Sequence, residues 1–198
     1  MMAVKRGCDV LGASVLLVLS APLLLLAAAA VRLTSPGPAF FRQVRIGKAG
    51  RPFEMFKLRT MVANAQAAEE GLARSQSGRT FLKVANDPRV TRLGCWLRKS
   101  SVDELPQLLN VLRGEMSLVG PRPLLECDRA RFPRDGRRRR FGMTPGLTGL
   151  WQVSGRSRTT FDEMVRLDLQ YARDQSLWLD LQILLRTPGA MLSGSGAY

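Results

Sequence analysis

The sequence contains no histidine, so the commonest general base and the commonest metal ligand are missing from any mechanism. Its three cysteines, Cys8, Cys95 and Cys127, are odd in number and widely spaced, which fits neither a disulfide framework nor a zinc site. We therefore expect reduced thiols in a cytosolic compartment. If the chain is an enzyme, carboxylates, basic side chains or hydroxyls must carry its chemistry.

Acidic residues are scarce relative to basic ones, and the net charge is +14. This excess indicates an anionic partner, which could be nucleic acid, an acidic membrane surface or a phosphorylated substrate. There are 25 arginines and only 5 lysines; codon bias could explain that ratio but not the net charge. Seven of the arginines lie between residues 129 and 140, where a solvated basic face or a contact with anionic lipid is the default interpretation.

The N-terminal region is a long apolar segment. Residues 10–31 carry no charge, Lys5 and Arg6 precede them, and Arg32 follows them. About 20 apolar residues suffice to cross a bilayer, so the segment predicts a membrane anchor. A cleaved signal peptide is disfavoured, because no small-x-small site leads into a cysteine-paired secreted domain.

The form of this anchor has two interpretations. Pro22, in the middle of the segment with Ser20 nearby, should break or kink the helix. Positive charge flanks both ends, whereas a spanning helix is usually biased to one side. Both facts favour a re-entrant helix that bends near Pro22 and returns to the same face, with a straight span as the alternative.

Two adjacent carboxylates, Asp103 and Glu104, lie where an amphipathic helix is expected to begin. Leucines recur at helical spacing after them, Pro106 is tolerated only in a first turn, and Gly114 should end the helix. At such a position the helix dipole and free N–H groups should keep Asp103 ionised. From these residues alone, a simple cap and a first-turn acid explain the pair equally well.

The remaining pattern predicts an α+β fold, mainly helical, with a compact cytoplasmic domain and one short β-hairpin. The hairpin is expected from strands at 39–46 and 52–59, with Lys57 and Arg59 on one face. The other expected elements are a helix at 60–72, a mobile loop at 73–86, a Gly-rich loop at 145–156, a helix at 161–172 and an apolar segment after Ser176. The expected divisions are a re-entrant membrane helix over residues 1–35, a catalytic domain over 36–192 and a disordered tail over 193–198.

Three stretches of the chain together resemble one family. They are FKLRTM (56–61), SVDELPQLLNVLRGEMSLVGPRP (101–123) and PGLTGLWQVSGR (145–156). In this order they are similar to the small monotopic phosphoglycosyl transferases, the bacterial sugar transferases that begin exopolysaccharide, capsule, O-antigen or glycoprotein glycan assembly. The family's helix-breaking Ser-Pro pair is here Ala21-Pro22, so the proline is kept and the adjacent hydroxyl is not.

The resemblance implies a chemistry. Family members use Mg²⁺, transfer a sugar 1-phosphate from a nucleotide sugar, usually a UDP-sugar, to undecaprenyl phosphate, and release a nucleoside monophosphate. The resemblance assigns Asp103 as the nucleophile and Glu104 as a metal-binding and supporting carboxylate, with both residues tied to the metal. An ionised carboxylate can attack phosphorus directly, so the scheme needs no histidine.

The resemblance also implies a set of basic groups that hold phosphates or the nucleotide. Arg98, Arg122 and Arg156 match the family's motif positions, and Lys57 and Arg59 are further candidates. The expected location is the cytoplasmic face of the bacterial inner membrane, in contact with lipid and without nucleic acid. The oligomeric state, including a homodimer, is left open. The alternative is a membrane-tethered basic adaptor without catalysis, which explains neither the acidic pair nor the Pro-Arg-Pro turn.

Overall fold

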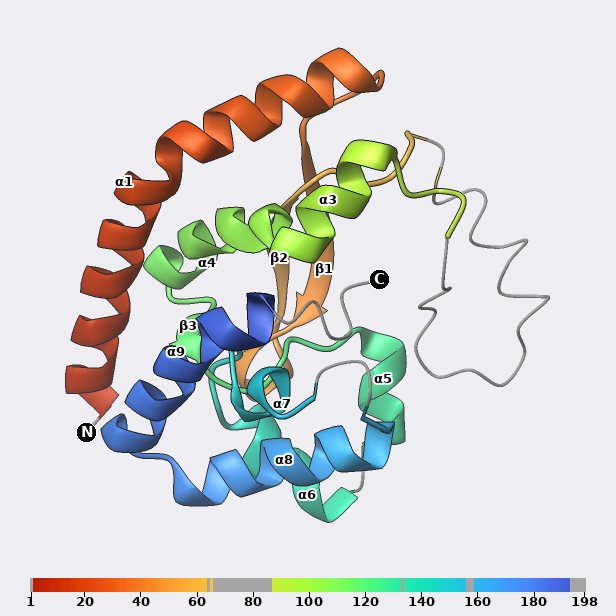
Figure 1. The fold of residues 1–198 in the computed structure, drawn as a ribbon. Coiled ribbons are helices and arrows are strands. Elements are labelled where there is room, and N and C mark those ends of the chain that lie inside the picture. Colours follow the sequence, from red (N-terminus) through yellow and green to blue (C-terminus); the bar gives the residue numbers. More distant parts are fainter. Residues whose placement is uncertain (1, 64, 66–86, 133, 156–158, 193–198) are drawn as a thin grey trace.

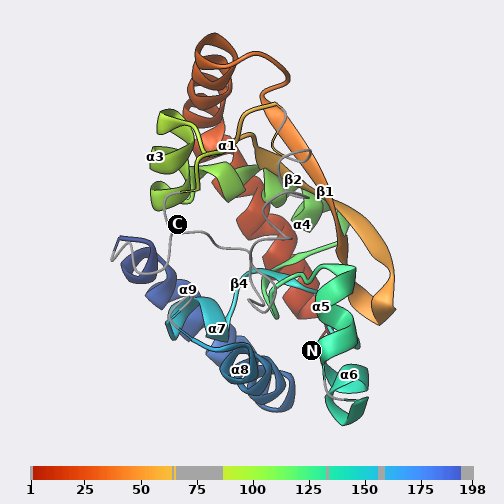
Figure 2. The same cartoon turned by 90° about the vertical axis from the view of Figure 1, so that its right-hand side faces the viewer.

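The computed structural model describes residues 2–63, 65, 87–132, 134–155 and 159–192. Most of these residues are helical, and two small two-stranded sheets lie among the helices (Figure 1). In Figure 2 the β1–β2 hairpin and the α8–α9 pair lie on opposite sides of the molecule. The α+β expectation with one short antiparallel hairpin is confirmed. The helix expected over 60–72 and the loop over 73–86 lie largely outside the described residues, as does the tail over 193–198.

The N-terminal helix α1 spans Met2–Thr34 and is long and apolar enough, by length and composition alone, to cross a membrane. The helix is continuous through Pro22, so the expected break is not seen as an interruption. Figure 1 shows instead that its axis changes direction part-way along. The Ser20 hydroxyl donates to the Leu16 carbonyl at 2.6 Å, a back-bond that accompanies helix bending.

The antiparallel hairpin consists of β1 (Phe40–Ile46) and β2 (Pro52–Leu58), joined through the short 3₁₀ helix η1 (Lys48–Gly50). Phe40 pairs with Leu58 and Ile46 with Pro52, close to the predicted limits. In this register Arg45 lies opposite Phe53 and therefore on the same face as Lys57. Arg59 follows the last strand residue and leaves that face.

The segment that carries the two carboxylates differs from the expected α-helix. Helix α3 (Arg92–Ser100) ends at Ser101, whose φ of 57° is left-handed, and the 3₁₀ helix η2 (Val102–Gln107) follows. The α-helix α4 (Leu108–Arg113) begins only after η2 and ends, as predicted, at Gly114. The α-helix expected to begin at the acidic pair therefore begins later, because the left-handed turn at Ser101 leads into the tighter 3₁₀ turn.

A second, parallel sheet joins β3 (Ser117–Val119) to β4 (Gly146–Thr148), and α7 (Leu150–Val153) follows it. The loop expected over 145–156 was therefore wrong for most of its length. Glycine at 146 allows the backbones of two segments to pack closely. A Cβ at this position would lie 2.0 Å from the Gly120 nitrogen, which is too close for any side chain. The positions of glycines in a sequence do not by themselves distinguish a flexible loop from a segment whose backbone packs against another backbone.

The C-terminal part is helical and covers the second sheet. The elements are α5 (Glu126–Arg131), α6 (Arg134–Phe141), α8 (Phe161–Asp174) and α9 (Leu177–Leu192). Helix α8 matches its prediction and begins with a capping box between Thr160 and Glu163. The Ser176 hydroxyl accepts a bond from the Leu179 nitrogen at 3.1 Å, as expected of a cap. Arg140 departs from the expected basic surface, because it is buried and its Nε donates to Asp168 at 3.1 Å.

Polar bonds fix the beginning of α1 to the rest of the fold. Lys5 donates to Asp180 of α9 at 2.6 Å and to the Val119 carbonyl of β3 at 3.0 Å. Arg6 donates to the Val111 and Leu112 carbonyls at 2.6 and 2.8 Å, which satisfies the open carbonyls at the end of α4. The Asp9 carboxylate accepts the Leu118 N–H at 3.0 Å. The apolar helix is thus an integral part of the domain surface.

One buried amide joins α4 to β2. Asn110 has no exposed surface, and its Oδ1 accepts the Phe56 N–H at 3.0 Å. Its Nδ2 donates to the Glu54 carbonyl at 2.7 Å and to Glu115 at 2.6 Å. These bonds fix the position of β2 along α4.

We expect Asn110→Leu to lower the free energy of unfolding by about 2–4 kcal/mol, because it leaves buried backbone groups of β2 unpaired. Chemical unfolding in detergent micelles measures this loss. Leu109→Ala is the matched control, because the Leu109 side chain is exposed at 40% and its truncation should cost little. Equal stability of the two variants would contradict the proposed importance of the amide.

Candidate active site

The two carboxylates of η2 lie in different environments. Asp103 is buried, with 6% of its surface exposed. The Glu104 side chain is more exposed, and its carboxylate forms an ion pair with Lys57 Nζ at 2.8 Å. Lys57 comes from the end of β2, so the hairpin brings a cation to the acidic pair. The structure thus brings three of the candidate residues, Asp103, Glu104 and Lys57, together.

Burial dominates the titration of Asp103. Loss of solvent and, to a smaller extent, the neighbouring Glu104 charge together raise its pKa from 3.8 to about 6, against the opposing charges of Lys57 and Arg98. The helix dipole was expected to keep this carboxyl ionised, and burial acts against that effect. A pKa of about 6 still leaves Asp103 mostly ionised at neutral pH. A desolvated carboxylate with few water contacts is a stronger nucleophile than an exposed one.

Arg98 belongs to the same cluster. It lies at the end of α3, and the left-handed turn at Ser101 folds η2 back beside it. Its Nε donates to the Thr60 hydroxyl at 2.9 Å. Burial lowers the pKa of Arg98 and the charge of Asp103 raises it, so the two groups stabilise one another's charged forms.

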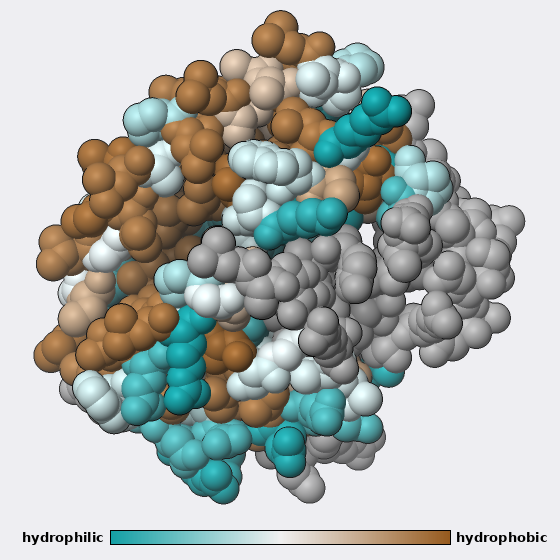
Figure 3. Space-filling view, viewed as in Figure 1, coloured by the Kyte–Doolittle hydropathy of each residue, from teal (hydrophilic) through white to brown (hydrophobic). Residues whose placement is uncertain are grey.

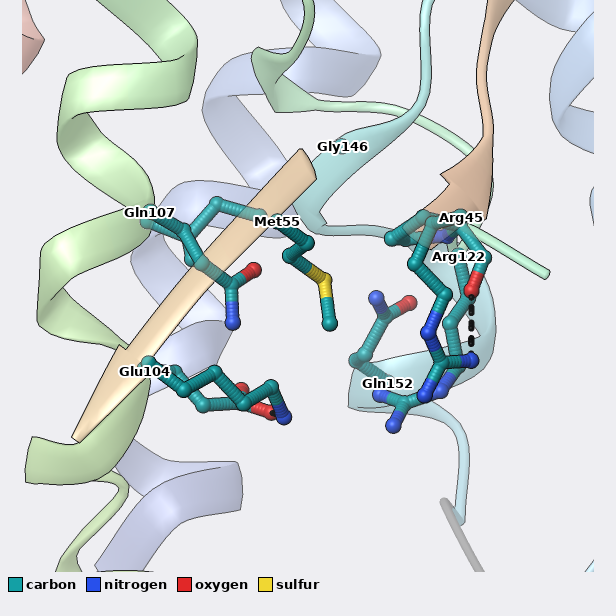
Figure 4. A pocket seen from close by; sticks show the side chains of 10 residues that line it. Arg45, Met55, Glu104, Gln107, Arg122, Gly146 and Gln152 are labelled. Atoms are coloured by element: carbon teal, nitrogen blue, oxygen red, sulfur yellow. Dashed lines mark hydrogen bonds and ion pairs between the residues drawn. The ribbon is translucent and has the colours of Figure 1, made fainter. Parts of the chain in front are cut away.

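A narrow cleft opens beside this pair (Figure 4). The residues that line it are Arg45, Met55, Lys57, Glu104, Gln107, Arg122, Pro123, Gly146, Leu147 and Gln152. In Figure 4 Glu104 and Gln107 form one wall, and Arg45, Arg122 and Gln152 form the facing wall. The cleft has a volume of about 10 Å³, which is enough for one water molecule. A larger ligand can enter only if the long side chains that line the cleft move.

The facing wall is strongly cationic. Burial and the nearby charge of Arg122 lower the pKa of Arg45 to about 10. Arg45 donates to the Pro123 carbonyl at 3.3 Å, beside the Pro-Arg-Pro turn. The Arg122 guanidinium lies 5.3 Å from the centre of the Trp151 ring. Two mutually repelling guanidiniums in a confined space are stabilised by an anion such as a phosphate.

A buried pair supports the Pro-Arg-Pro turn from behind. Arg140 donates to the Arg122 carbonyl and also holds Asp168, whose pKa burial raises to about 6 against the effect of Arg140. Arg140 contacts the backbone of the turn, and Asp168 holds Arg140. They therefore fix the position from which the Arg122 side chain extends.

The other candidate residues lie elsewhere. Arg59 is buried and donates to the carbonyls of Ser35, at 2.8 Å, and of Pro36, where the chain leaves α1. Its guanidinium is therefore engaged at the end of that helix. Arg156 lies outside the described residues. Pro22 lies within α1, as described above.

Sequence reasoning missed Arg45, Gln107 and Gln152 as cleft residues. The pairing register of the hairpin would have placed Arg45 on the face of Lys57. Gln107 follows Glu104 by three residues, a spacing that places the two on one face of a 3₁₀ helix and also of an α-helix. Gln152 had no such signal, because the helix that carries it was taken for a loop.

The cluster is compatible with Mg²⁺. Among the described residues, no three His, Cys, Asp or Glu side chains gather into a potential metal site. Mg²⁺ is commonly held by one or two carboxylates, with water and substrate phosphates as the other ligands. Asp103 and Glu104 fit that mode, and they are the residues that would hold the ion.

The family model described as bacterial sugar transferase matches residues 1–194. The chain belongs to this family. The three motifs on which the resemblance rested therefore identified it correctly, and the acidic pair lies inside the matched region of this sugar transferase.

Several relatives have names that state a reaction or a process. The UDP-glucose:undecaprenyl-phosphate glucose-1-phosphate transferase of Caulobacter vibrioides is 48% identical, over 98% of this chain and 72% of its own. The exopolysaccharide production protein ExoY of Rhizobium meliloti is 43% identical, over 98% and 88%. The undecaprenyl-phosphate galactose phosphotransferase of Salmonella typhimurium is 40% identical over 98% of this chain, which spans only 41% of that longer protein.

The pKa of Asp103 predicts how stability depends on pH. The folded state holds this proton up to about pH 6, whereas the unfolded state releases it near 3.8, so folding is progressively disfavoured as pH rises through that window. We expect Asp103→Asn to remove this penalty and to be more stable than the wild type by about 3 kcal/mol at pH 7.5, with little difference near pH 4.

Unfolding curves at pH 4–8 in the presence of a chelator measure this difference. Asp174→Asn is the control, because Asp174 is exposed and its Arg173 partner lowers its pKa. This control should gain no stability as pH rises. An Asp103→Asn variant that is less stable than the wild type at pH 7.5 would refute the burial argument.

Proposed function

We propose that this sugar transferase moves a sugar 1-phosphate from a UDP-sugar to undecaprenyl phosphate through a covalent intermediate on Asp103. The observation that carries the proposal is a buried carboxylate with a raised pKa, which feels the charges of Lys57 and Arg98 and is followed in the chain by Glu104, a residue of the cleft that contains Arg45 and Arg122. The names of relatives in Caulobacter vibrioides and Salmonella typhimurium, which state a sugar-phosphate transfer to undecaprenyl phosphate, support the reaction class.

The proposed reaction has two steps. A carboxylate oxygen of Asp103 attacks the sugar-bound phosphorus, the new O–P bond forms, and the pyrophosphate P–O bond breaks so that UMP leaves with the electron pair. A phosphate oxygen of undecaprenyl phosphate then attacks the same phosphorus and displaces Asp103. The product is undecaprenyl-diphosphate-sugar, and the carboxylate is restored. This would be the first membrane step of bacterial glycoconjugate assembly.

The chain's own residues address the electrostatic barrier to this attack. A carboxylate and a pyrophosphate repel each other, so cations must neutralise the phosphate oxygens before they can approach. Arg45 and Arg122 supply that charge from one wall of the cleft, and Lys57 and Arg98 supply it beside the nucleophile. Mg²⁺ held by Asp103 and Glu104 would add charge neutralisation on the phosphates.

A direct test of the proposal uses Asp103→Asn. We expect turnover to fall by at least about 10³-fold, because an amide cannot form the intermediate. The wild type, incubated with its UDP-sugar and Mg²⁺ but without lipid acceptor, should release UMP and gain the mass of a sugar phosphate on the peptide that contains Asp103. Asp174→Asn, at an exposed site on α8, should behave like the wild type. Normal turnover by Asp103→Asn, or an adduct on another residue, would reject the mechanism.

The attachment of α1 supports a monotopic placement. The beginning of α1 bonds to α9, β3 and α4, through Lys5 and Arg6. Its other end is held by Arg59, which donates to Ser35. Both ends therefore contact one folded domain, which cannot lie on both sides of a bilayer. We propose that α1 enters one leaflet, bends in the region of Pro22 and returns to the cytoplasmic face.

The outer surface of the molecule supports the same placement. Brown, hydrophobic side chains cover the α1 edge in Figure 3, whereas hydrophilic side chains gather at the opposite end, over α8. Helix α9 buries Ile183 but exposes Trp178 at 66% and Leu185 at 72%, so one of its faces is apolar and open. Exposed tryptophan and leucine beside an apolar helix are typical of a membrane interface.

Cysteine labelling tests the membrane topology. In a Cys95→Ser, Cys127→Ser background, the exposed Cys8 marks one end of α1, and Ser35→Cys marks the other in a second variant that also lacks Cys8. A membrane-impermeant maleimide applied to spheroplasts should label neither site, and permeabilised cells should be labelled at both. Labelling of one end from the periplasmic side would establish a straight span and contradict the monotopic placement.

A further inference from the structure

Two buried glutamines in the cleft have polar atoms without a partner. Gln107, on η2, is 3% exposed, and its Nε2 has no hydrogen-bond partner. Gln152, on α7, is 8% exposed, and its Oε1 has none. Buried polar atoms are nearly always paired in folded proteins, because an unpaired one costs about 1–3 kcal/mol. Two such atoms in one cleft indicate a ligand that supplies their missing hydrogen bonds.

The two amides belong to opposite walls of the same cleft (Figure 4). Gln107 lies on the wall of Glu104, and Gln152 lies on the wall of Arg45 and Arg122. The Oε1 of Gln152 lies close to Gly149, since a Cβ on that glycine would lie 2.9 Å from it. The two side chains thus lie on either side of the space beside Glu104.

Their chemistry is complementary and neutral. The Nε2 of Gln107 offers N–H donors, and the Oε1 of Gln152 offers an acceptor. A phosphate, which only accepts at neutral pH, would satisfy the first atom and be repelled by the second. A group that accepts one hydrogen bond and donates another satisfies both. A sugar hydroxyl and the imide edge of uracil both have that property.

We propose that Gln107 and Gln152 are specificity-determining residues that together recognise a neutral donor-and-acceptor group of the nucleotide sugar, while the cleft's arginines hold its phosphates. This inference rests on the proposed function. The two glutamines would discriminate between donor substrates, because a nucleotide sugar without the matching group would leave both buried atoms without a hydrogen bond. The shared chemistry has two sources, the sugar and the base, which the experiment separates.

The experiment compares Gln107→Leu and Gln152→Leu with the wild type and with Gln170→Leu. Gln170 lies on the exposed face of α8 and is the matched control. The substrates are the best donor from a panel of UDP-sugars, its C4 epimer and its cytidine counterpart, with polyprenyl phosphate and Mg²⁺. We expect kcat/KM for the best donor to fall about tenfold or more in each cleft variant, and Gln170→Leu to remain at the wild-type value.

The pattern of lost discrimination identifies the recognised group. If the amides contact a sugar hydroxyl, the variants lose the preference for the best donor over its epimer and keep the preference for uridine. If they contact uracil, whose imide N–H cytosine lacks, the preference for uridine over cytidine falls instead. Variants that keep both preferences and a kcat/KM within twofold of the wild type would overturn the inference.

Thermal unfolding without nucleotide separates recognition from a structural role. Because the two atoms have no partner within the protein, Gln107→Leu and Gln152→Leu should not lower the unfolding temperature. Asn110→Leu, three residues after Gln107, removes a fully bonded amide and should lower it clearly. A loss of stability in Gln107→Leu equal to that in Asn110→Leu would show that the amide is structural, against the inference.

The outcome for the wild type separates this inference from the proposed function. Turnover of a UDP-sugar by the wild type, with unaffected glutamine variants, rejects only the inference. Failure of the wild type to turn over any donor of the panel rejects the proposed function and the inference with it.

Discussion

The geometry of the site depends on the amide of Asn110. Its bonds on both sides of Met55, to Glu54 and Phe56, fix the hairpin along the helix that follows the acidic pair. A shift of β2 by one residue would turn Lys57 away from Glu104, because side chains alternate across a strand. The 2.8 Å ion pair between Lys57 and Glu104 therefore depends on the register that the Asn110 amide fixes as well as on the two charges.

Two opposing electrostatic effects act on the charged groups of the site: burial and the attraction between opposite charges. Burial disfavours the charged forms of both Asp103 and Arg98, and the attraction between them restores part of what burial costs. A chain with fewer cations could not keep an aspartate ionised at this depth. Part of the net charge of +14 has another role, because Arg6 and Arg59 satisfy carbonyls at helix ends and Arg140 supports the Pro-Arg-Pro turn.

Prediction from sequence succeeded where a local pattern is sufficient. The limits of the hairpin, the end of α4 at Gly114 and helix α8 all follow from turn residues and periodicity. It failed over 145–156, because glycines that permit two backbones to touch have the same composition as glycines in a mobile loop. It also failed to place Arg45, whose role in the cleft depends on cross-strand pairing.

The sequence by itself determined the chemical inventory: a chain without histidine, an adjacent Asp and Glu, an excess of arginine and an apolar N-terminal helix. These follow from residue identity and local spacing, and the three motifs were sufficient to indicate the family. Only the tertiary structure decided how deeply Asp103 is buried, which arginines reach the cleft and that both ends of α1 contact one domain. Burial, pKa and pairing depend on residues far apart in the chain, and local spacing carries no information about those distances.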